Sequence, residues 1–91
     1  MIKSYQLIIT GRVQGVFYRA SIRDKATEWG IKGFVKNEDD RSVYAEIEGN
    51  EEILNTMIDW ANHGPSGAKV EEVKLVEQPI KRFIGFEIRR G

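Results

Sequence analysis

The chain contains no cysteine and only one histidine among its 91 residues. Without cysteine it can supply no disulfide, no thiol nucleophile and no thiolate metal site. One histidine does not suggest a metal centre, and no serine, histidine and aspartate are spaced persuasively for a catalytic triad. The sequence therefore indicates neither a thiol nucleophile nor a metal centre nor a catalytic triad.

Long apolar runs are also missing. No stretch approaches the roughly 20 apolar residues of a membrane-spanning helix, and the first residues lack the basic, apolar and small-residue pattern of a signal peptide. With the missing cysteines, these absences point to the cytoplasm and to no membrane partner. The length suits one domain with one core, so we expect a single domain over residues 1–91.

The charge is balanced overall, with 14 basic and 14 acidic residues, but it is unevenly distributed. Residues 1–37 hold seven basic and two acidic residues, residues 38–78 three and eleven, and residues 79–91 four and one. We expect the acidic middle to form mostly the solvated faces of a helix and two strands, whereas the basic first third favours an anionic ligand. Zero net charge argues against a general nucleic-acid binder, so no nucleic-acid partner is expected.

Hydrophobic periodicity predicts the order β-α-β-β-α-β followed by one further strand. The first half is expected to contain a strand over residues 3–11, a helix over 18–29, a strand over 32–37 and a hairpin turn over 38–42. A strand then starts at residue 43 and ends at Gly49 and Asn50. Asn50 caps the second helix, which ends at His63, Gly64 and Pro65, and two strands follow, over residues 68–77 and 83–89. Two helices on one face of an antiparallel-dominated sheet, the ferredoxin-like α/β sandwich, is the economical α+β arrangement of these elements.

Local signals support two of these assignments. Ile22, Ala26 and Trp29 lie at the helical spacing i, i+4 and i+7, and a glycine follows as the C-terminal stop. The apolar parity of the strand after the second helix changes midway, which predicts a β-bulge near Glu71 and Glu72.

Residues 11–19 read Gly-Arg-Val-Gln-Gly-Val-Phe-Tyr-Arg and join the first strand to the first helix. A glycine-rich turn from a strand into a helix directs several backbone N–H groups at one point, and the helix N-terminus adds partial positive charge. The first acidic residue of the helix is Asp24, so its own side chains leave those N–H groups open to an external anion. Arg19 adds a guanidinium fork suited to phosphate. The pattern indicates an oxyanion site for a phosphoryl group; the alternative is an ordinary turn with a solvated Arg19.

This segment does not match the nucleotide-binding P-loop, which has four residues between its glycines followed by Gly-Lys-Ser/Thr. Three residues separate Gly11 from Gly15, and Val16 stands where that motif continues. Because the lysine and the Mg²⁺-binding hydroxyl are absent, the sequence disfavours nucleoside triphosphate chemistry.

Three other residues have both a functional and a structural interpretation. Asn37 ends a predicted strand, and standing alone it is more often a turn residue that satisfies local backbone groups. Phe34 faintly matches the RNA-binding RNP1 pattern, but the other aromatics of that pattern are missing, so we interpret it as a core residue. His63 falls at a helix C-terminus, where it is expected to serve the last carbonyls and the helix dipole.

Three motifs together resemble the acylphosphatase family. They are residues 11–19, the segment 30–37 (Gly-Ile-Lys-Gly-Phe-Val-Lys-Asn) with Asp40 and Val43 after it, and the segment 64–70 (Gly-Pro-Ser-Gly-Ala-Lys-Val). The resemblance extends over nearly the whole chain, the first motif is long and specific, and the three motifs occur in the family's order.

The resemblance implies a small ferredoxin-like enzyme that hydrolyses the carboxyl–phosphate bond of acyl phosphates without a metal or organic cofactor. Carried over residue by residue, it implies that Arg19 binds the phosphoryl oxygens and that Asn37 positions the attacking water. The phosphate cradle that it implies consists of the backbone N–H groups of Gly15, Val16, Phe17, Tyr18 and Arg19. The expected partners are small acyl phosphates, with inorganic phosphate or sulfate as product-like anions, and we expect a monomer.

Three positions depart from the family pattern. Tyr18 stands where phenylalanine is commoner and Phe34 where tryptophan is commoner, and we expect little effect because both keep an aromatic body. Arg41 stands where the family usually has glycine. If the hairpin turn still requires a positive φ there, Arg41 is strained, and replacing it with glycine is expected to stabilise the fold.

Two other functions stay open at the level of the sequence. A domain of the same fold can hold an acyl- or carbamoyl-phosphate-like anion for a partner, as acylphosphatase-like domains occur inside hydrogenase-maturation proteins. The sheet can instead bind RNA, although the missing aromatics and zero net charge count against this. A free-standing chain with both Arg19 and Asn37 favours the enzyme, and the sequence does not indicate which acyl phosphate it uses.

Overall fold

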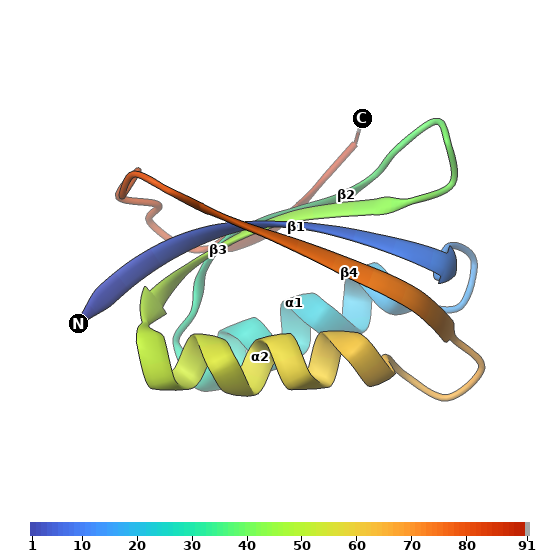
Figure 1. Ribbon diagram of the computed structural model, residues 1–91, viewed down its shortest axis with the longest axis horizontal. Coiled ribbons are helices and arrows are strands. Elements are labelled where there is room, and N and C mark those ends of the chain that lie inside the picture. The colour runs from blue at the N-terminus through green and yellow to red at the C-terminus, as the bar shows by residue number, and fades with distance from the viewer. Residues whose placement is uncertain (91) are drawn as a thin grey trace.

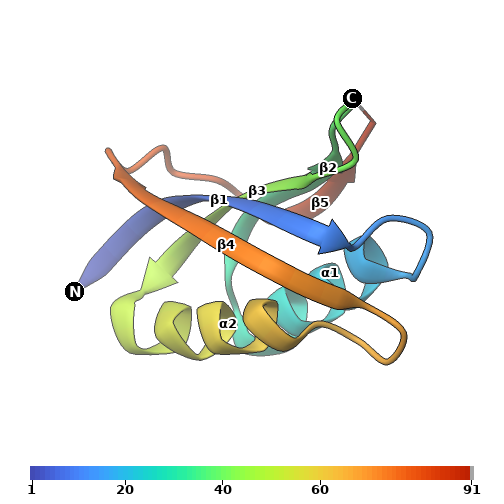
Figure 2. The same cartoon turned by 45° about the vertical axis from the view of Figure 1, so that its right-hand side comes forward.

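Two helices lie on one face of a five-stranded sheet in the computed structural model, which describes residues 1–90 (Figure 1). The elements are β1 (Ile2–Arg12), α1 (Tyr18–Trp29), β2 (Lys32–Asn37), β3 (Val43–Asn50), α2 (Glu51–His63), β4 (Lys69–Gln78) and β5 (Phe86–Arg89). The strand order is β4-β1-β3-β2-β5, in which β5 runs parallel to β2 and the other neighbours are antiparallel. A second view shows both helices on the same side of the sheet (Figure 2). The predicted α+β class and ferredoxin-like arrangement are confirmed.

The core lies between the sheet and the helices and follows from the two periodicities of the sequence. Alternate residues of the central strands face the helices, and residues three or four apart on each helix face the sheet. The side chains with no exposed surface there include Leu7, Ile9, Ile22, Ala26, Val35, Val43, Ala45, Ile47, Leu54 and Met57. Fully burying an aliphatic side chain contributes roughly 1.5–3 kcal/mol. Because these buried side chains pack α1 against the sheet, they fix where α1 begins relative to the ends of β1 and β2.

The helices begin and end as predicted. Helix α1 stops at Gly30, whose φ of 71° is the left-handed conformation that commonly ends a helix. Helix α2 begins after Asn50, whose side chain accepts a hydrogen bond from the Glu52 N–H at 3.0 Å. Trp29, predicted to lie on the apolar face of α1, is partly buried against the core.

The predicted bulge is present where β1 and β4 pair. Thr10 lies opposite Glu72 and Gly11 lies opposite Val70, so Glu71 is the additional residue. Gly11 has a φ of 122°, and a Cβ there would collide with a backbone carbonyl oxygen of β4. Only glycine fits here, and the chain leaves the sheet after the next residue, Arg12, toward the start of α1.

The last strand begins later than predicted. It covers Phe86–Arg89 rather than residues 83–89. Residues 79–85, here called the strap, form no strand and pass over the sheet face opposite the helices, with Ile84 94% exposed. The prediction was wrong because Ile84 continues the apolar alternation of β5 although its side chain faces solvent.

The expectation that the acidic middle is solvated is wrong for Glu46 and Glu48, which are each 5% exposed. Both point from β3 to the face that the strap covers. The Glu48 carboxylate accepts hydrogen bonds from the backbone N–H groups of Lys81 and Phe83, at 2.7 and 3.1 Å. Glu46 accepts one from the Tyr44 hydroxyl at 2.6 Å and pairs with the Lys81 ammonium at 3.0 Å. These partners compensate the burial of the two charges and hold the strap on the sheet.

Phe34 is buried as predicted, but it lies under the strap and outside the core between sheet and helices. Its ring centroid is 5.9 Å from those of Tyr44 and Phe83, and the Arg89 guanidinium lies 3.9 Å above it. A covered ring cannot stack on a nucleotide base. The burial of Phe34 thus removes the main feature that favoured RNA binding.

Candidate functional site

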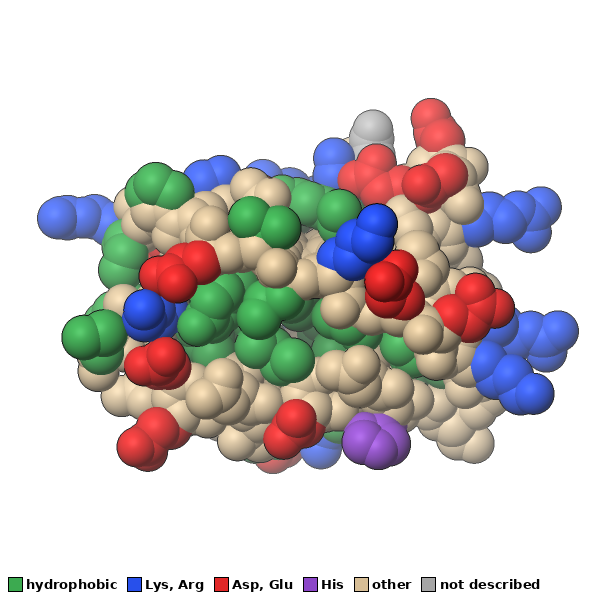
Figure 3. All heavy atoms as spheres, in the orientation of Figure 1, with side chains coloured by type: hydrophobic (Ala, Val, Ile, Leu, Met, Phe, Trp, Pro, Cys, Tyr) green, Lys and Arg blue, Asp and Glu red, His purple; other side chains and the backbone are tan. Residues whose placement is uncertain are grey.

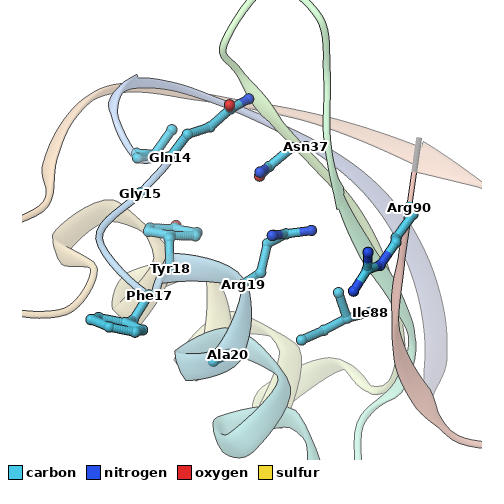
Figure 4. A pocket seen from close by; sticks show the side chains of 10 residues that line it. Gln14, Gly15, Phe17, Tyr18, Arg19, Ala20, Asn37, Ile88 and Arg90 are labelled. Carbon is cyan, nitrogen blue, oxygen red and sulfur yellow. The ribbon is translucent and has the colours of Figure 1, made fainter.

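The loop of residues 13–17 joins β1 to α1 and forms one wall of a cavity of about 390 Å³ (Figure 4). Val13, with 1% of its surface exposed, anchors the loop in the core. Gly15 and Phe17 have positive φ values of 75° and 61°, and residues in this conformation bend a loop so that successive N–H groups converge. For Phe17 the conformation costs roughly 1–2 kcal/mol, and its 83% exposed ring makes no compensating core contact. Strain of this kind is typical of functional loops.

The N–H groups from Gly15 to Arg19 face no acceptor in the described part of the chain, since none of the hydrogen bonds within residues 1–90 is donated by them. Helix α1 begins without a side-chain cap and without an acidic residue in its first turn, as the position of Asp24 predicted. The ladder of α1 begins with the Ser21 N–H, which donates to the Phe17 carbonyl at 2.9 Å. An uncapped helix N-terminus carries about half a positive charge. Loop and helix together therefore present a set of donors suited to an anion.

Arg19 and Asn37, the two predicted site residues, line the same cavity from α1 and from the end of β2. Figure 4 shows the guanidinium and the carboxamide directed into one space. Asn37 follows the buried Val35 by two positions, so its side chain lies on the helix-facing side of β2. The strand period thus aims Asn37 at the first turn of α1.

The Asn37 Oδ1 atom is buried and has no hydrogen-bond partner within residues 1–90. The turn that follows is closed by other groups. The Glu38 N–H donates to the Ser42 carbonyl at 2.9 Å, and the Asp40 carboxylate accepts from the Ser42 N–H at 3.0 Å. The turn therefore does not use the Asn37 side chain, which argues against its interpretation as a turn residue. Leaving a buried acceptor unpaired costs about 1–3 kcal/mol, so the atom is suited to a donor that enters the cavity.

Gln14 contributes to the site in a way that the sequence analysis missed. Its Nε2 donates to the carbonyls of Glu38 and Ser42, at 2.9 and 2.8 Å. These two bonds tie the loop before α1 to the hairpin after β2, and they hold Asn37 next to the loop. The available signal was a carboxamide inside the motif of residues 11–19, because an NH₂ group with two donors can bridge two segments.

Tyr18 supplies a backbone N–H to the loop, while its side chain fixes α1 against α2. The ring is buried, and its hydroxyl donates to the Ala61 carbonyl at 2.7 Å. Burial raises the pKa of the Tyr18 hydroxyl far above its ordinary value, so the group stays protonated and keeps this bond. The predicted small effect of tyrosine at this position fits the geometry, because the hydroxyl finds a partner.

Ile88 and Arg90 also line the cavity, although the sequence analysis assigned them no role there. They come from the end of the chain, and β5 brings them to the site by pairing with β2, where Val35 lies opposite Ile88. Figure 4 shows the Arg90 guanidinium directed into the cavity from the side opposite the loop.

Among residues 1–90 the cavity lining contains no carboxylate, and no three histidine, cysteine, aspartate or glutamate side chains converge. The single histidine, His63, lies at the end of α2 with its Nδ1 2.8 Å from the Asp59 carbonyl oxygen, as its position predicted. The groups that do line the cavity are N–H donors, guanidinium groups and a carboxamide. Such groups bind anions and water.

Comparison with known proteins gives one consistent result. The sequence model of the family described as Acylphosphatase matches residues 5–88. The chain is 42% identical over 88 residues to the acylphosphatase of Albidiferax ferrireducens, covering 97% of this chain and 95% of that protein. Its fold is similar to the crystal structure of acylphosphatase from Bacillus subtilis, with a TM-score of 0.93, 31% identity and coverage of 98% and 99%. It is also similar to HypF of T. kodakarensis, with a TM-score of 0.85 and 28% identity, but over 12% of that longer chain.

Proposed function

The chain belongs to the acylphosphatase family, and on this premise we propose that the cavity between α1 and β2 is where the enzyme hydrolyses its substrate. The reaction cleaves the bond between phosphorus and the carboxyl oxygen of a small acyl phosphate, and it yields a carboxylate and inorganic phosphate. The proposal assigns the phosphoryl group to Arg19 and the loop, and the attacking water to Asn37.

The chemistry explains why such a site needs no histidine, thiolate or paired carboxylates. An acyl phosphate is a mixed anhydride, and its carboxylate leaves without being protonated. The water oxygen forms a bond to phosphorus while the bond to the carboxyl oxygen breaks, and that electron pair leaves with the carboxylate. The protons of the water pass to the phosphate product and the solvent. Catalysis then requires a water held in line with the breaking bond and donors matched to the charge on the phosphoryl oxygens.

Arg19 and the backbone N–H groups from Gly15 to Arg19 supply those donors. The guanidinium is a planar fork that can bind two phosphoryl oxygens at once, and the N–H groups of the loop face the remaining oxygens. Preorganised donors that strengthen as charge develops can each lower the barrier by ~3–4 kcal/mol. Their lack of acceptors within residues 1–90 supports this assignment.

The observation that carries the proposal is the buried Asn37 Oδ1 atom, unpaired within residues 1–90, in the same cavity as Arg19. A carboxamide oxygen accepts a hydrogen bond from water and so fixes the direction of the water's lone pair. It is too weak a base to remove a proton. The role of Asn37 is therefore to place the water, and its contribution appears in the transition state rather than in substrate binding.

This proposal is tested by Asn37→Ala with benzoyl phosphate as the substrate. We expect kcat to fall by about 10³ or more, because the substitution removes a contact to the attacking water. The dissociation constant of inorganic phosphate, measured by calorimetry, should change little because the phosphoryl donors remain in place. The two measurements together separate water positioning from phosphate binding.

Asn62→Ala is the matched control, because Asn62 lies on the exposed side of α2 and donates to the Ile58 carbonyl at 2.9 Å. It should turn over benzoyl phosphate at the wild-type rate. Wild-type kcat in Asn37→Ala would return Asn37 to the hairpin turn and reject its role. An equal loss of phosphate binding and kcat would show that Asn37 shapes the phosphate cradle instead.

A binding module without turnover is the second candidate, because the fold also matches a short part of HypF. Such a module needs the cradle but has no use for an unpaired acceptor beside it. Relatives that match over almost their whole length are named acylphosphatases, which favours the enzyme. A wild-type chain that binds phosphate but releases none from benzoyl phosphate would support the module.

We also propose a monomeric enzyme of the cytoplasm. Neither helix in residues 1–90 is long and apolar enough to cross a membrane, and the chain has no cysteine to pair in an oxidising compartment. Figure 3 shows acidic and basic side chains around the apolar ones on the face that β4 and α2 present. The exposed Glu71, Glu72 and Lys74 on the edge strand β4 disfavour pairing with a second copy. Light scattering during size exclusion measures the molar mass, and the mass of a dimer would overturn the proposed monomer.

A further inference from the structure

Arg90 is the second arginine of the cavity and lies outside the motifs from which the site was predicted. It follows β5 directly, and it shares the cavity with Arg19. Figure 4 shows the two guanidinium groups reaching into the space from different sides, with Ile88 below Arg90. Within residues 1–90, neither Arg19 nor Arg90 takes part in an ion pair. Two like charges held around one space repel each other unless an anion lies between them.

The preceding residue, Arg89, lies in different surroundings from Arg90. Arg89 pairs with Glu87 at 2.6 Å and covers the ring of Phe34, on the strap side of the sheet. Because side chains alternate along a strand, Arg90 takes the other direction, toward the cavity. The position of Arg90 in the site thus follows from the pairing of β5 with β2.

The charges in the cavity exceed what one phosphoryl group balances. A phosphate monoester carries a charge of about −1.5 to −2 at neutral pH. The N-terminus of α1 contributes about +0.5 and Arg19 contributes one full positive charge, so the two nearly match the phosphoryl group. The exposed Arg90 raises the positive charge around the cavity to about +2.5, which exceeds the charge of the phosphoryl group by ~0.5–1. A negative charge on the acyl part of the substrate would match this excess.

The size of the cavity agrees with an acyl group that reaches Arg90. A water molecule, with one heavy atom, takes about 30 Å³ of liquid, so the four heavy atoms of a phosphoryl group take ~120 Å³. The cavity measures about 390 Å³, which leaves room for an acyl group of several heavy atoms. Ala20 and Ile88 give this part an apolar lining.

We propose that Arg90 is a specificity-determining residue that binds an anionic group on the acyl part, so that the preferred substrates are acyl phosphates carrying a second negative charge. This inference rests on the proposed function, because it takes Arg19 and the loop as the phosphoryl site. The bound substrate would lie with its phosphoryl end at the start of α1, its carbon body over Ile88 and Ala20, and its distal anion at Arg90.

The experiment compares pairs of substrates that differ in charge and hardly in size. The 3- and 4-carboxybenzoyl phosphates are each measured against the corresponding carbamoylbenzoyl phosphate, which replaces the carboxylate by a neutral amide. The wild-type enzyme should have the higher kcat/KM for the carboxylate of at least one pair. In Arg90→Gln this preference should fall about tenfold or more, mostly through KM, because a charge-assisted hydrogen bond is lost. Added salt should reduce the wild-type preference, since a charge at the rim of a site is screened.

Arg89→Gln is the matched control, because it removes the adjacent positive charge from the other face of β5 and should keep the wild-type preference. An Arg90→Gln enzyme that loses kcat/KM equally on the charged and the neutral substrate would overturn the inference and make Arg90 part of the phosphoryl site. An unchanged preference would also overturn it, as would a wild-type enzyme with no preference for either carboxylate. Failure of the wild-type enzyme to hydrolyse benzoyl phosphate is a different result, because that failure rejects the proposed function itself.

Discussion

Arg19 offers a sharp test at the scale of a single residue, because lysine keeps its charge and removes its geometry. The half-buried guanidinium of Arg19 lines the cavity beside the loop N–H groups, and its fork can bind two oxygens of a phosphoryl group. An ammonium is a point charge and cannot reproduce that pair of bonds. We expect Arg19→Lys to weaken phosphate binding about tenfold or more and to lower kcat/KM for benzoyl phosphate at least a hundredfold. Calorimetry and phosphate-release assays measure the two effects.

The matched control for this prediction lies on the same helix. Arg23 pairs with Asp24 at 3.3 Å on the exposed side of α1, so Arg23→Lys should leave both quantities at their wild-type values. If Arg19→Lys bound phosphate as tightly as the wild type does, the assignment of the phosphoryl group to Arg19 would be wrong.

Residues differ in how far the sequence alone could assign them to the site. Arg19 and Asn37 were predicted as site residues from motifs that resemble those of the acylphosphatase family, and both line the same cavity. Gln14 acts through carbonyls 24 and 28 residues away, and nothing in its neighbourhood specifies those partners. Arg90 enters the cavity only because β5 pairs in parallel with β2. Contacts between distant elements depend on the assembled sheet, and a local pattern does not contain them.

The hairpin between β2 and β3 contains a strain that the sequence predicted from a missing glycine. Arg41 has a φ of 74° and its N–H donates to the Glu38 carbonyl at 3.2 Å, which closes the turn. A left-handed conformation costs roughly 1–2 kcal/mol in a residue with a Cβ. Glycine removes this cost, but it raises the entropic cost of folding by ~0.4–1 kcal/mol because the unfolded chain has more freedom. Arg41→Gly should therefore raise the free energy of unfolding by about 0.5–1 kcal/mol, or Tm by ~2–8 °C.

Arg41→Ala separates backbone strain from loss of the side chain. Alanine keeps the Cβ and therefore the strain, so this variant should stay within about 0.5 kcal/mol of the wild type. Urea unfolding of the three proteins gives the comparison. Equal stability of the glycine and alanine variants, or a less stable glycine variant, would reject the strained-turn explanation.

The elements show the same division between local and distant causes. Both ends of α1 could be predicted because the helical spacing and Gly30 are local features. The bulge in β4 could be predicted because an additional residue shifts the apolar parity along one strand. The start of β5 could not, since Ile84 continues the strand pattern while the strap leaves it exposed. The burial of Glu48 could not either, because its hydrogen-bond donors lie 33 and 35 residues further along the chain.

At the scale of the whole molecule, the strap makes stability depend on pH. Burial acts to raise the pKa of Glu48, but hydrogen bonds that include those from the N–H groups of Lys81 and Phe83 outweigh it and hold that pKa below its ordinary value of 4.5. Burial opposes ionisation of Glu46 in the same way, and its bonds from Tyr44 and other neighbours likewise keep its pKa low. The closing of the sheet face and the ionisation of these carboxylates are therefore linked.

The sign of the pH effect follows from the direction of these shifts. A carboxylate whose pKa is lower in the folded than in the unfolded chain contributes stability that is complete above the unfolded value, here 4.5. That contribution is lost as the pH falls from 4.5 through the folded pKa. The contribution of Glu46 and Glu48 to the free energy of unfolding should thus be constant above about pH 6. It should decline below about pH 5.

Glu48→Gln tests this link, because glutamine keeps the size of the side chain and removes the charge. At pH 7 the free energy of unfolding of the variant should be lower by about 1.5–3 kcal/mol, the usual contribution of hydrogen bonds to a charged group. The reason is that one end of the amide now presents N–H to the N–H groups of the strap. Below pH 4 its deficit should shrink, since the wild-type carboxylate is then becoming protonated as well. Urea unfolding at pH 7, 5, 4 and 3 measures the deficit. Glu28→Gln is the control, because it alters an exposed carboxylate on α1, and its free energy of unfolding should follow that of the wild type at every pH. A Glu48→Gln deficit of constant size from pH 7 to 3 would show that packing rather than ionisation causes it.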